Sequence, residues 1–158
     1  PEKFLELAAL FPDVHFVAAG MGRSLVWDNN LRIKYKKLSN LEFTGFLDQF
    51  SNTQLTELLS RSWILVNTSV REGLPTSFVE AAIHGCAILS GIDPDGFASQ
   101  FGFYVKDNDY MAGLKYLLAD NNWARLGQRA KDHSLRLFDM NESIQRHIKI
   151  YQELTVHD

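Results

Sequence analysis

Two carboxylates and a turn suited to phosphate lie close together in the stretch EGLPTSFVEAAIHG. Glu72 and Glu80 are eight positions apart in it. Between them, Gly73 lets a ligand approach the backbone closely, and Pro75 suits the start of a helix. Free N–H groups and the positive dipole end at a helix start favour an anion, most usefully a phosphate. The stretch therefore suggests a ligand built of sugar, phosphate and sugar, with acids for the hydroxyls and amides for the phosphate.

Each carboxylate also has a simpler interpretation. Ser77-x-x-Glu80 fits a capping box, in which Glu80 only satisfies the backbone N–H of Ser77. Glu72 alone could be a solvated loop acid, as most surface glutamates are. The pair could also serve a glycoside hydrolase, but its placement around a phosphate-ready helix start argues against that. Taken together in this context, the two acids favour a ligand site.

The elements around this stretch follow from apolar patterning. The run 63–66 predicts a buried strand before Glu72, a helical pattern covers 76–84 with Glu80 in its first turn, and 86–90 predicts the next buried strand. The same patterns predict further helices over 2–11, 23–38, 109–119, 122–137 and 141–154, and further strands over 14–19, 41–44 and 103–105.

Helix starts and inward faces can be predicted as well. Ser51-x-x-Gln54 and Asp139-x-x-Glu142 fit capping boxes that open a helix through Leu59 and the last helix of the chain. The inward residues predicted for the three C-terminal helices are Tyr110, Leu114, Leu117 and Leu118, then Trp123, Leu126, Ala130 and Leu137, then Ile144, Ile148, Tyr151 and Leu154.

Alternating strands and helices predict one α/β domain. Strands that are apolar throughout indicate a parallel sheet covered on both faces, a Rossmann-like three-layer sandwich. Ligands then bind at the carboxyl ends of the strands. Gly20, Gly45, Glu72 and Gly91 all follow predicted strands, so we expect them to cluster on one edge.

The residues Glu72 to Pro75, Glu80 to Ala82 and Gly85 resemble the E-x7-E signature of retaining glycosyltransferases of group 1 (family four), which have the GT-B fold. In that family the element belongs to the C-terminal domain and holds the nucleotide-sugar donor. The resemblance implies that residues 1–158 are this donor-binding domain, without its first strand and without the N-terminal acceptor domain.

The resemblance also implies roles for single residues. Glu72 would be the catalytic residue, binding sugar hydroxyls near the anomeric carbon, and Glu80 would accept hydrogen bonds from ribose hydroxyls. The donor-binding residues implied are Gly20, Gly22, Phe46, Leu47, Gly73, Leu74, Pro75, Thr76, Ser77 and Glu80. Gly20 and Gly22 fit a tight strand-to-helix turn equally well. For Phe46 we expect core packing in preference to a stacking platform.

The implied function is transfer of a hexose-like sugar from a nucleotide diphosphate sugar to an acceptor, with retention of configuration. The family places an arginine and a lysine just before residue 1 and binds the acceptor in its N-terminal domain, so we expect this chain alone to be inactive. Two alternatives remain: a non-catalytic nucleotide-sugar binding module, and a nucleotide-sugar epimerase or hydrolase on the GT-B architecture. Presence of both Glu72 and Glu80 argues against a dead module.

The acidic residues, the net charge and the single cysteine limit the cofactors and partners that can be expected. No cofactor or metal is implied; Asp93 and Asp95 could hold a divalent ion in a transferase of the GT-A fold, but the proline and glycine beside them favour a turn. A net charge of −3 gives no electrostatic case for nucleic acid. Cys86, the only cysteine, excludes an internal disulfide and suggests a buried inert thiol.

The remaining partners follow from the resemblance alone. The acceptor would be a sugar or a lipid-linked molecule bound by the N-terminal domain. We expect a cytoplasmic protein, with any peripheral contact to the inner face of the membrane made through that domain. No apolar run approaches the length of a membrane span.

Overall fold

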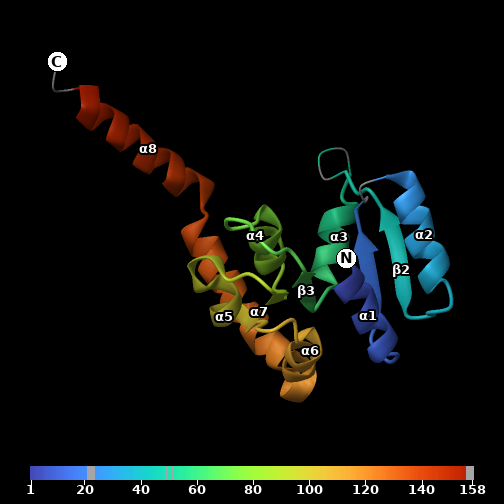
Figure 1. Ribbon diagram of the computed structural model, residues 1–158. Helices are drawn as coiled ribbons and strands as arrows, with labels where there is room; N and C mark the ends of the chain where they lie inside the picture. Colours follow the sequence, from blue (N-terminus) through green and yellow to red (C-terminus); the bar gives the residue numbers. More distant parts are fainter. Residues whose placement is uncertain (21–23, 49, 51, 156–158) are drawn as a thin grey trace.

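The computed structural model describes residues 1–20, 24–48, 50 and 52–155 (Figure 1). Helices and strands alternate along most of the chain, as predicted. The elements are α1 (Glu2–Leu10), β1 (Phe16–Ala19), α2 (Leu25–Tyr35), β2 (Leu41–Gly45), α3 (Gln54–Ser60), β3 (Ile64–Asn67), α4 (Thr76–Ile83), β4 (Ala87–Ser90), the 3-10 turn η1 (Pro94–Gly96), α5 (Phe97–Phe101), β5 (Gly102–Tyr104), α6 (Tyr110–Leu118), the 3-10 turn η2 (Ala119–Asn121), α7 (Asn122–Leu137) and α8 (Met140–Thr155).

The strands within the described ranges pair in parallel, but they form two sheets. In one sheet β1 pairs with β2, with Phe16 opposite Leu41. In the other, β4 lies between β3 and β5, with Ile88 opposite Gly102. The predicted parallel pairing is confirmed, whereas the predicted single sheet is replaced by two separate ones.

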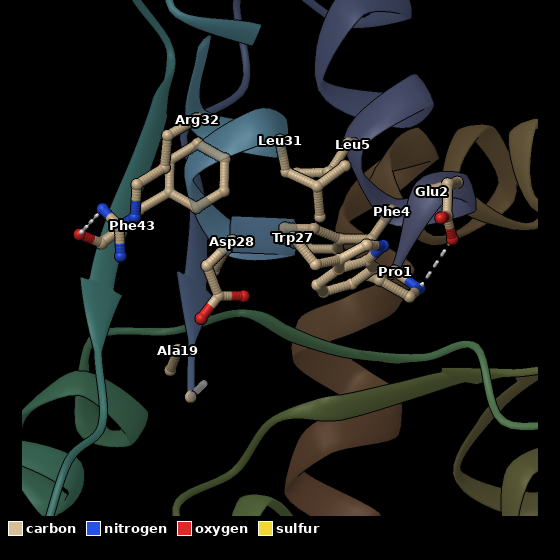
Figure 2. Close-up of a pocket in the computed structure, with 12 residues that line it drawn as sticks. Pro1, Glu2, Phe4, Leu5, Ala19, Trp27, Asp28, Leu31, Arg32 and Phe43 are labelled. Carbon is tan, nitrogen blue, oxygen red and sulfur yellow. Dashed lines mark hydrogen bonds and ion pairs between the residues drawn. The ribbon is translucent and has the colours of Figure 1, made fainter. Parts of the chain in front are cut away.

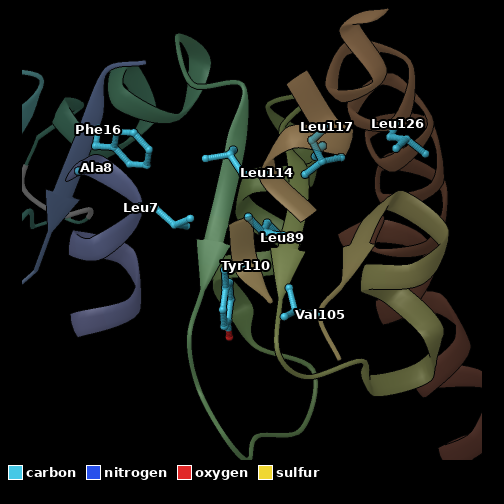
Figure 3. Packing of buried hydrophobic residues seen from close by; sticks show 10 residues of the cluster. Leu7, Ala8, Phe16, Leu89, Val105, Tyr110, Leu114, Leu117 and Leu126 are labelled. Carbon is cyan, nitrogen blue, oxygen red and sulfur yellow. The ribbon is translucent and has the colours of Figure 1, made fainter. Parts of the chain in front are cut away.

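Helices cover both faces of the larger sheet. Leu89 on one face of β4 belongs to a core cluster that includes Leu7 of α1 and Leu117 of α6 (Figure 3). Ile88 on the opposite face packs in a second cluster, with Phe78 of α4 and other residues of α5 and α7. All four residues of β4 are fully buried. The predicted three-layer sandwich is therefore confirmed around β4.

The strand β3 is less buried than its apolar sequence suggested. All its residues are half-buried, and Trp63 just before it is 52% exposed. The Trp63 ring stacks on Trp123 of α7, with centroids 4.6 Å apart and planes 6° apart. The predicted strand over 63–66 is confirmed as β3, but its predicted burial was wrong, because β3 pairs only on its β4 side in the described structure.

The last helix begins as predicted, but none of its residues is buried in the described structure. The Glu142 N–H donates to Asp139 Oδ1 over 2.8 Å, which confirms the predicted cap. Figure 1 shows α8 projecting away from the rest of the molecule, and none of its residues is buried. The prediction that Ile144, Ile148, Tyr151 and Leu154 point inward was wrong, as it was for Leu137 of α7.

The short helices α3 and α5 differ from the sequence-based expectations. Ser51, the first residue of the predicted capping box, lies outside the described residues, and α3 begins at Gln54 after an N-cap at Thr53 without a side-chain cap bond. The five-residue helix α5 was not predicted. Among the residues that the structure describes, no helix has the length and apolarity needed to cross a bilayer.

Candidate functional site

The helix α4 starts without a side-chain cap. Its N-cap is Pro75, in extended conformation at φ −66° and ψ 138°, and no side chain accepts a bond from its first turn. The Phe78 N–H donates to the Pro75 carbonyl over 3.0 Å. The N–H groups of Thr76 and Ser77 precede that bond, at the positive end of the helix dipole. This is the geometry that the sequence predicted for an anion.

Glu80 does not close a capping box. Ser77 is the second residue of α4 and not its N-cap, so the capping interpretation was wrong. Glu80 is the fifth residue, in the second turn and not in the first as predicted. Its side chain is half-buried, and its carboxylate has no hydrogen bond or ion pair among the described residues. His84 contacts the Glu80 backbone carbonyl through Nδ1 over 2.8 Å, which leaves the carboxylate available for a ligand.

Glu72 lies exposed in the loop between β3 and α4 and, within the described chain, has no partner either. A Cβ added at Gly73 would meet nothing within 4 Å, so the backbone beside Glu72 is open to a ligand. Leu74 packs against the second core cluster and Pro75 is buried. The loop is thus anchored by its apolar residues while its acid and its glycine face outward.

A glycine with a positive φ value follows β1. Gly20 has φ +108° and donates its N–H to the Gly45 carbonyl over 2.7 Å, and Gly45 has φ +77°. These positive φ values favour glycine whether or not a ligand binds. The tight strand-to-helix turn predicted at Gly20 and Gly22 continues into residues outside the described ranges, so the turn and a phosphate contact there both stay predictions. Gly22 lies outside the described residues.

Phe46 is 68% exposed, so the expectation of core packing was wrong. It directly follows β2, which belongs to a two-stranded sheet, and nothing in the described structure buries it. Leu47 is half-buried. An aromatic ring left exposed at the carboxyl end of a strand is free to stack on a planar ligand.

The predicted clustering at one edge holds within each sheet. The bond between Gly20 and Gly45 joins the ends of β1 and β2. The Gly91 N–H donates to the Asn67 carbonyl over 3.4 Å and joins the ends of β4 and β3. The two sheets are not hydrogen-bonded to each other, so these two groups of residues remain separate.

Two hollows lie near this edge, and neither is lined by Glu72 or Glu80. The larger, about 660 Å³, is a cleft between α1, β1 and α2 with Gly20 at one end (Figure 2). In Figure 2 the aromatic rings of Phe4, Trp27 and Phe43 lie around it, and Arg32 donates to the Phe43 carbonyl over 3.2 Å. The exposed Glu72 and the half-buried Glu80 therefore lie outside these two hollows.

The smaller hollow, about 420 Å³, lies at the carboxyl ends of β3, β4 and β5. Tyr110 lines it and donates its hydroxyl to the Asn67 carbonyl over 3.2 Å. Burial raises the pKa of Tyr110 above its usual value, so the hydroxyl stays protonated and keeps this bond. Tyr110 was predicted only as a core residue of a helix, because helical spacing does not show where the ring's polar end lies.

The turn after β4 is confirmed. Asp93 Oδ1 accepts from the Ser99 N–H over 3.0 Å, and its carbonyl accepts from Gly96 over 3.2 Å. Asp95 has φ +54° within η1. Across the described ranges, no group of three or more His, Cys, Asp or Glu side chains is placed to hold a metal ion.

Cys86 is buried, as predicted. Its Sγ contacts the carbonyls of Leu59 and Ser62 at 3.4 and 3.3 Å. Burial raises the pKa of the thiol to about 11, so it remains protonated at neutral pH. This is the environment of an inert structural cysteine.

Parallel strands alternating with helices, with Gly20 and an uncapped helix start at their carboxyl ends, define a Rossmann-like α/β class of domain. The family described as "Glycosyl transferases group 1" matches residues 2–120. The chain belongs to this family, which confirms the resemblance stated for the E-x7-E stretch.

Solved structures share the fold. The pneumococcal O-GlcNAc transferase GtfA, in complex with UDP and GlcNAc, is 16% identical with a TM-score of 0.74 over 99% of this chain and 32% of that one. AviGT4, a glycosyltransferase involved in avilamycin A biosynthesis, is 18% identical with a TM-score of 0.63 over 98% of this chain and 48% of that one. The chain therefore spans about a third and about half of these two proteins. No curated protein matches it.

Proposed function

We propose that this chain is the donor-binding domain of a retaining glycosyltransferase and takes a nucleotide diphosphate sugar at the start of α4. One observation carries the proposal: an uncapped helix start lies between two carboxylates that have no partner in the described structure. Membership of the group 1 family supports transferase chemistry. The presence of UDP and GlcNAc in the GtfA complex supports this class of donor.

Three groups divide the donor between them. The backbone N–H groups from Leu74 to Ser77 hold the diphosphate and offset the charge that develops on the leaving group. The Glu80 carboxylate accepts hydrogen bonds from the ribose hydroxyls. Glu72 binds the sugar hydroxyls near the anomeric carbon, and Gly73 keeps this approach open because a ligand meets no side chain there.

The other contacts are assigned by position. Phe46 stacks on the nucleobase, with Leu47 beside it, and the Gly20 turn approaches the phosphates. The charge on the diphosphate is offset by backbone amides and by groups from outside this chain, without a metal ion. The acceptor binds to the rest of the polypeptide; neither of the two hollows described above is lined by Glu72 or Glu80.

The test uses a longer polypeptide that contains this chain together with the proposed acceptor domain. Calorimetric titration of UDP, GDP and ADP into this longer polypeptide and into its Glu80→Ala variant tests the donor site. A hydrogen bond to a charged group contributes roughly 1.5–3 kcal/mol. We therefore expect the variant to bind the preferred nucleotide about tenfold or more weakly, with its melting temperature unchanged.

The control is Glu6→Ala, which removes an exposed acid on α1 that pairs with Lys3 and should leave the affinity unchanged. If Glu80→Ala lowered the melting temperature and left the affinity alone, Glu80 would be a structural residue and the proposed ribose contact would be wrong. Nucleotide binding without transfer to any acceptor would instead indicate a binding module.

A further inference from the structure

The loop between β3 and α4 carries Glu72 and is held at its two ends. From Val70 to Gly73, the loop makes no hydrogen bond or ion pair with another described residue. Its far end is fixed, because Leu74 packs against the second core cluster and Pro75 is buried. The position of Glu72 therefore depends on how the loop leaves β3 at its near end.

Asn67, the last residue of β3, fixes that near end with three hydrogen bonds. Its side-chain Oδ1 accepts from the Ser69 N–H over 2.9 Å, which forms an Asx turn and bends the chain after the strand. Its backbone carbonyl accepts from the Gly91 N–H over 3.4 Å and from the Tyr110 hydroxyl over 3.2 Å. A carbonyl oxygen has two lone pairs, so both donors can bind it at once. The start of the loop is thereby joined to the end of β4 and to α6.

The Tyr110 hydroxyl is held in place by the core. Tyr110 is the first residue of α6 and is only 5% exposed, in the core cluster that contains Leu89 of β4. Figure 3 shows its oxygen pointing away from the other core residues, toward the carboxyl ends of the strands. The helix start is also fixed, because Asp109 Oδ1 accepts from the Ala112 N–H over 2.9 Å. A buried ring on a capped helix has little freedom, so its hydroxyl can hold the Asn67 carbonyl in one place.

Gly91, at the end of β4, makes room for this hydroxyl. A Cβ at position 91 would overlap the Tyr110 hydroxyl oxygen, whereas the other atoms near it would lie 3.5 Å away or more. The φ angle of Gly91 lies outside the left-handed region that favours glycine, so the backbone alone does not require glycine here. The hydroxyl is therefore the group that excludes a side chain at this position.

We propose that Tyr110 is a positioning residue, whose hydroxyl acts through the Asn67 carbonyl to fix the loop that carries Glu72. The effect on catalysis rests on the proposed function, whereas the hold on the loop does not. The proposed nucleotide contacts lie elsewhere, at the start of α4 and at Glu80, and Leu74 and Pro75 anchor that helix start separately. Loss of the hydroxyl should therefore misplace Glu72 and spare nucleotide binding.

The variant Tyr110→Phe of the longer polypeptide tests the proposal, because it removes the hydroxyl and keeps the buried ring. We expect kcat for sugar transfer to fall about ten- to a hundredfold, since a misplacement of about 1 Å can cost about a hundredfold. The affinity for the preferred nucleotide, measured by calorimetry, should stay within about twofold. The matched control is Tyr116→Phe on the same helix, whose exposed hydroxyl has no hydrogen bond among the described residues. An equal fall of kcat in both variants, or an equal fall of kcat and affinity in Tyr110→Phe, would contradict the proposal.

Two double variants identify the groups through which the hydroxyl acts. In the Glu72→Ala background, Tyr110→Phe should lower the residual kcat less than about twofold, because its effect passes through Glu72. Gly91→Ala should lower kcat about tenfold while the hydroxyl is present, and less than about twofold further in Tyr110→Phe, where the overlapping atom is gone. Effects that simply multiply in either pair would show that the hydroxyl does not act through these groups, and the proposal would be wrong.

The order of the loop separates this proposal from the proposed function. Backbone order parameters of residues 70–73, measured by NMR relaxation, should fall toward those of flexible segments in Tyr110→Phe and stay unchanged in Tyr116→Phe. If Glu72→Ala left turnover unchanged, the proposed function would fail, but a fall in these order parameters would still support the hold of Tyr110 on the loop. Unchanged order parameters in Tyr110→Phe would overturn the proposal, whatever the kinetics.

Discussion

Glu72 and Glu80 differ in their burial and in the kind of element that carries them. Glu72 stands exposed on a loop anchored by Leu74 and Pro75, whereas Glu80 is half-buried on a helix. Their spacing was enough to predict that both flank a helix start. The sequence could not predict the exposure of Phe46, because the exposure of an aromatic ring depends on which segments cover it and not on its neighbours in sequence.

Replacing Glu72 with alanine in the longer polypeptide should lower kcat/KM for sugar transfer about a hundredfold or more. The expected loss is that of one group stabilising the reacting centre. The melting temperature should not change, because the Glu72 side chain has no described partner. Initial rates with the preferred nucleotide sugar measure the effect, with Arg71→Ala as the neighbouring exposed control. Unchanged turnover in the Glu72→Ala variant would show that Glu72 takes no part in the reaction.

Nucleotide binding should not require a divalent ion. Asp93 is occupied as an acceptor for Ser99, and Asp95 lies in a 3-10 turn. Titrations with excess chelator and with added manganese should give the same affinity to within about twofold. A large loss on chelation that manganese restores and Asp95→Ala abolishes would contradict both the turn interpretation and the proposed mechanism.

At the scale of elements, α7 packs directly against the end of α4. A Cβ at Gly127 of α7 would overlap the Gly85 carbonyl oxygen, just past α4. That neighbour is backbone, which cannot rotate away as a side chain can. Close contact at Gly127 thus fixes the C-terminal end of the helix that carries Glu80.

The variant Gly127→Ala should be less stable by about 1–3 kcal/mol, a typical cost of overpacking. Helix propensity alone would favour alanine by roughly 0.5–1 kcal/mol, so the sign of the change separates the two effects. Urea unfolding measures it, and Gln128→Ala on the exposed face of α7 is the control. A stabilised Gly127→Ala variant would mean that α7 and α4 are not held in this contact.

Periodicity predicted most elements but not what covers them. The pattern over 122–137 gave α7 with its observed bounds, since sixteen residues supply several turns of signal. The five residues of α5 were too few for a pattern. In α8 the apolar stripe was predicted correctly as a stripe, but periodicity shows which face is apolar and not whether a partner lies against it.

At the scale of the whole molecule, the division into two sheets limits what this chain can do alone. Gly20 follows β1 of the smaller sheet, whereas the start of α4 follows β3 of the larger sheet. A helix terminus contributes only about 0.3–1 kcal/mol at an exposed site, or up to ~2 when partly buried. Glu72 is exposed and lines neither of the two hollows described above, so neither hollow would orient an acceptor over it.

The chain alone should therefore bind nucleotides weakly and transfer no detectable sugar. Orientation of the reactants can supply ~7–11 kcal/mol of the barrier, which corresponds to many powers of ten in rate. A transfer assay over a panel of nucleotide sugars, with protein purified free of the longer form, checks this expectation. Transfer that accompanies this chain and disappears in Glu72→Ala would show that the active site is complete without further residues.

The stacked rings of Trp63 and Trp123 give the molecule its own optical probe. Of its three tryptophans, these two join β3 to α7, whereas Trp27 of α2 lies beside the β1–β2 sheet. In a variant with phenylalanine at positions 63 and 123, the emission of Trp27 reports the unfolding of the smaller sheet. In a variant with phenylalanine at position 27, the emission of the stacked pair reports the unfolding of the larger sheet. Comparing the two unfolding curves therefore tells whether the two sheets melt as one cooperative unit.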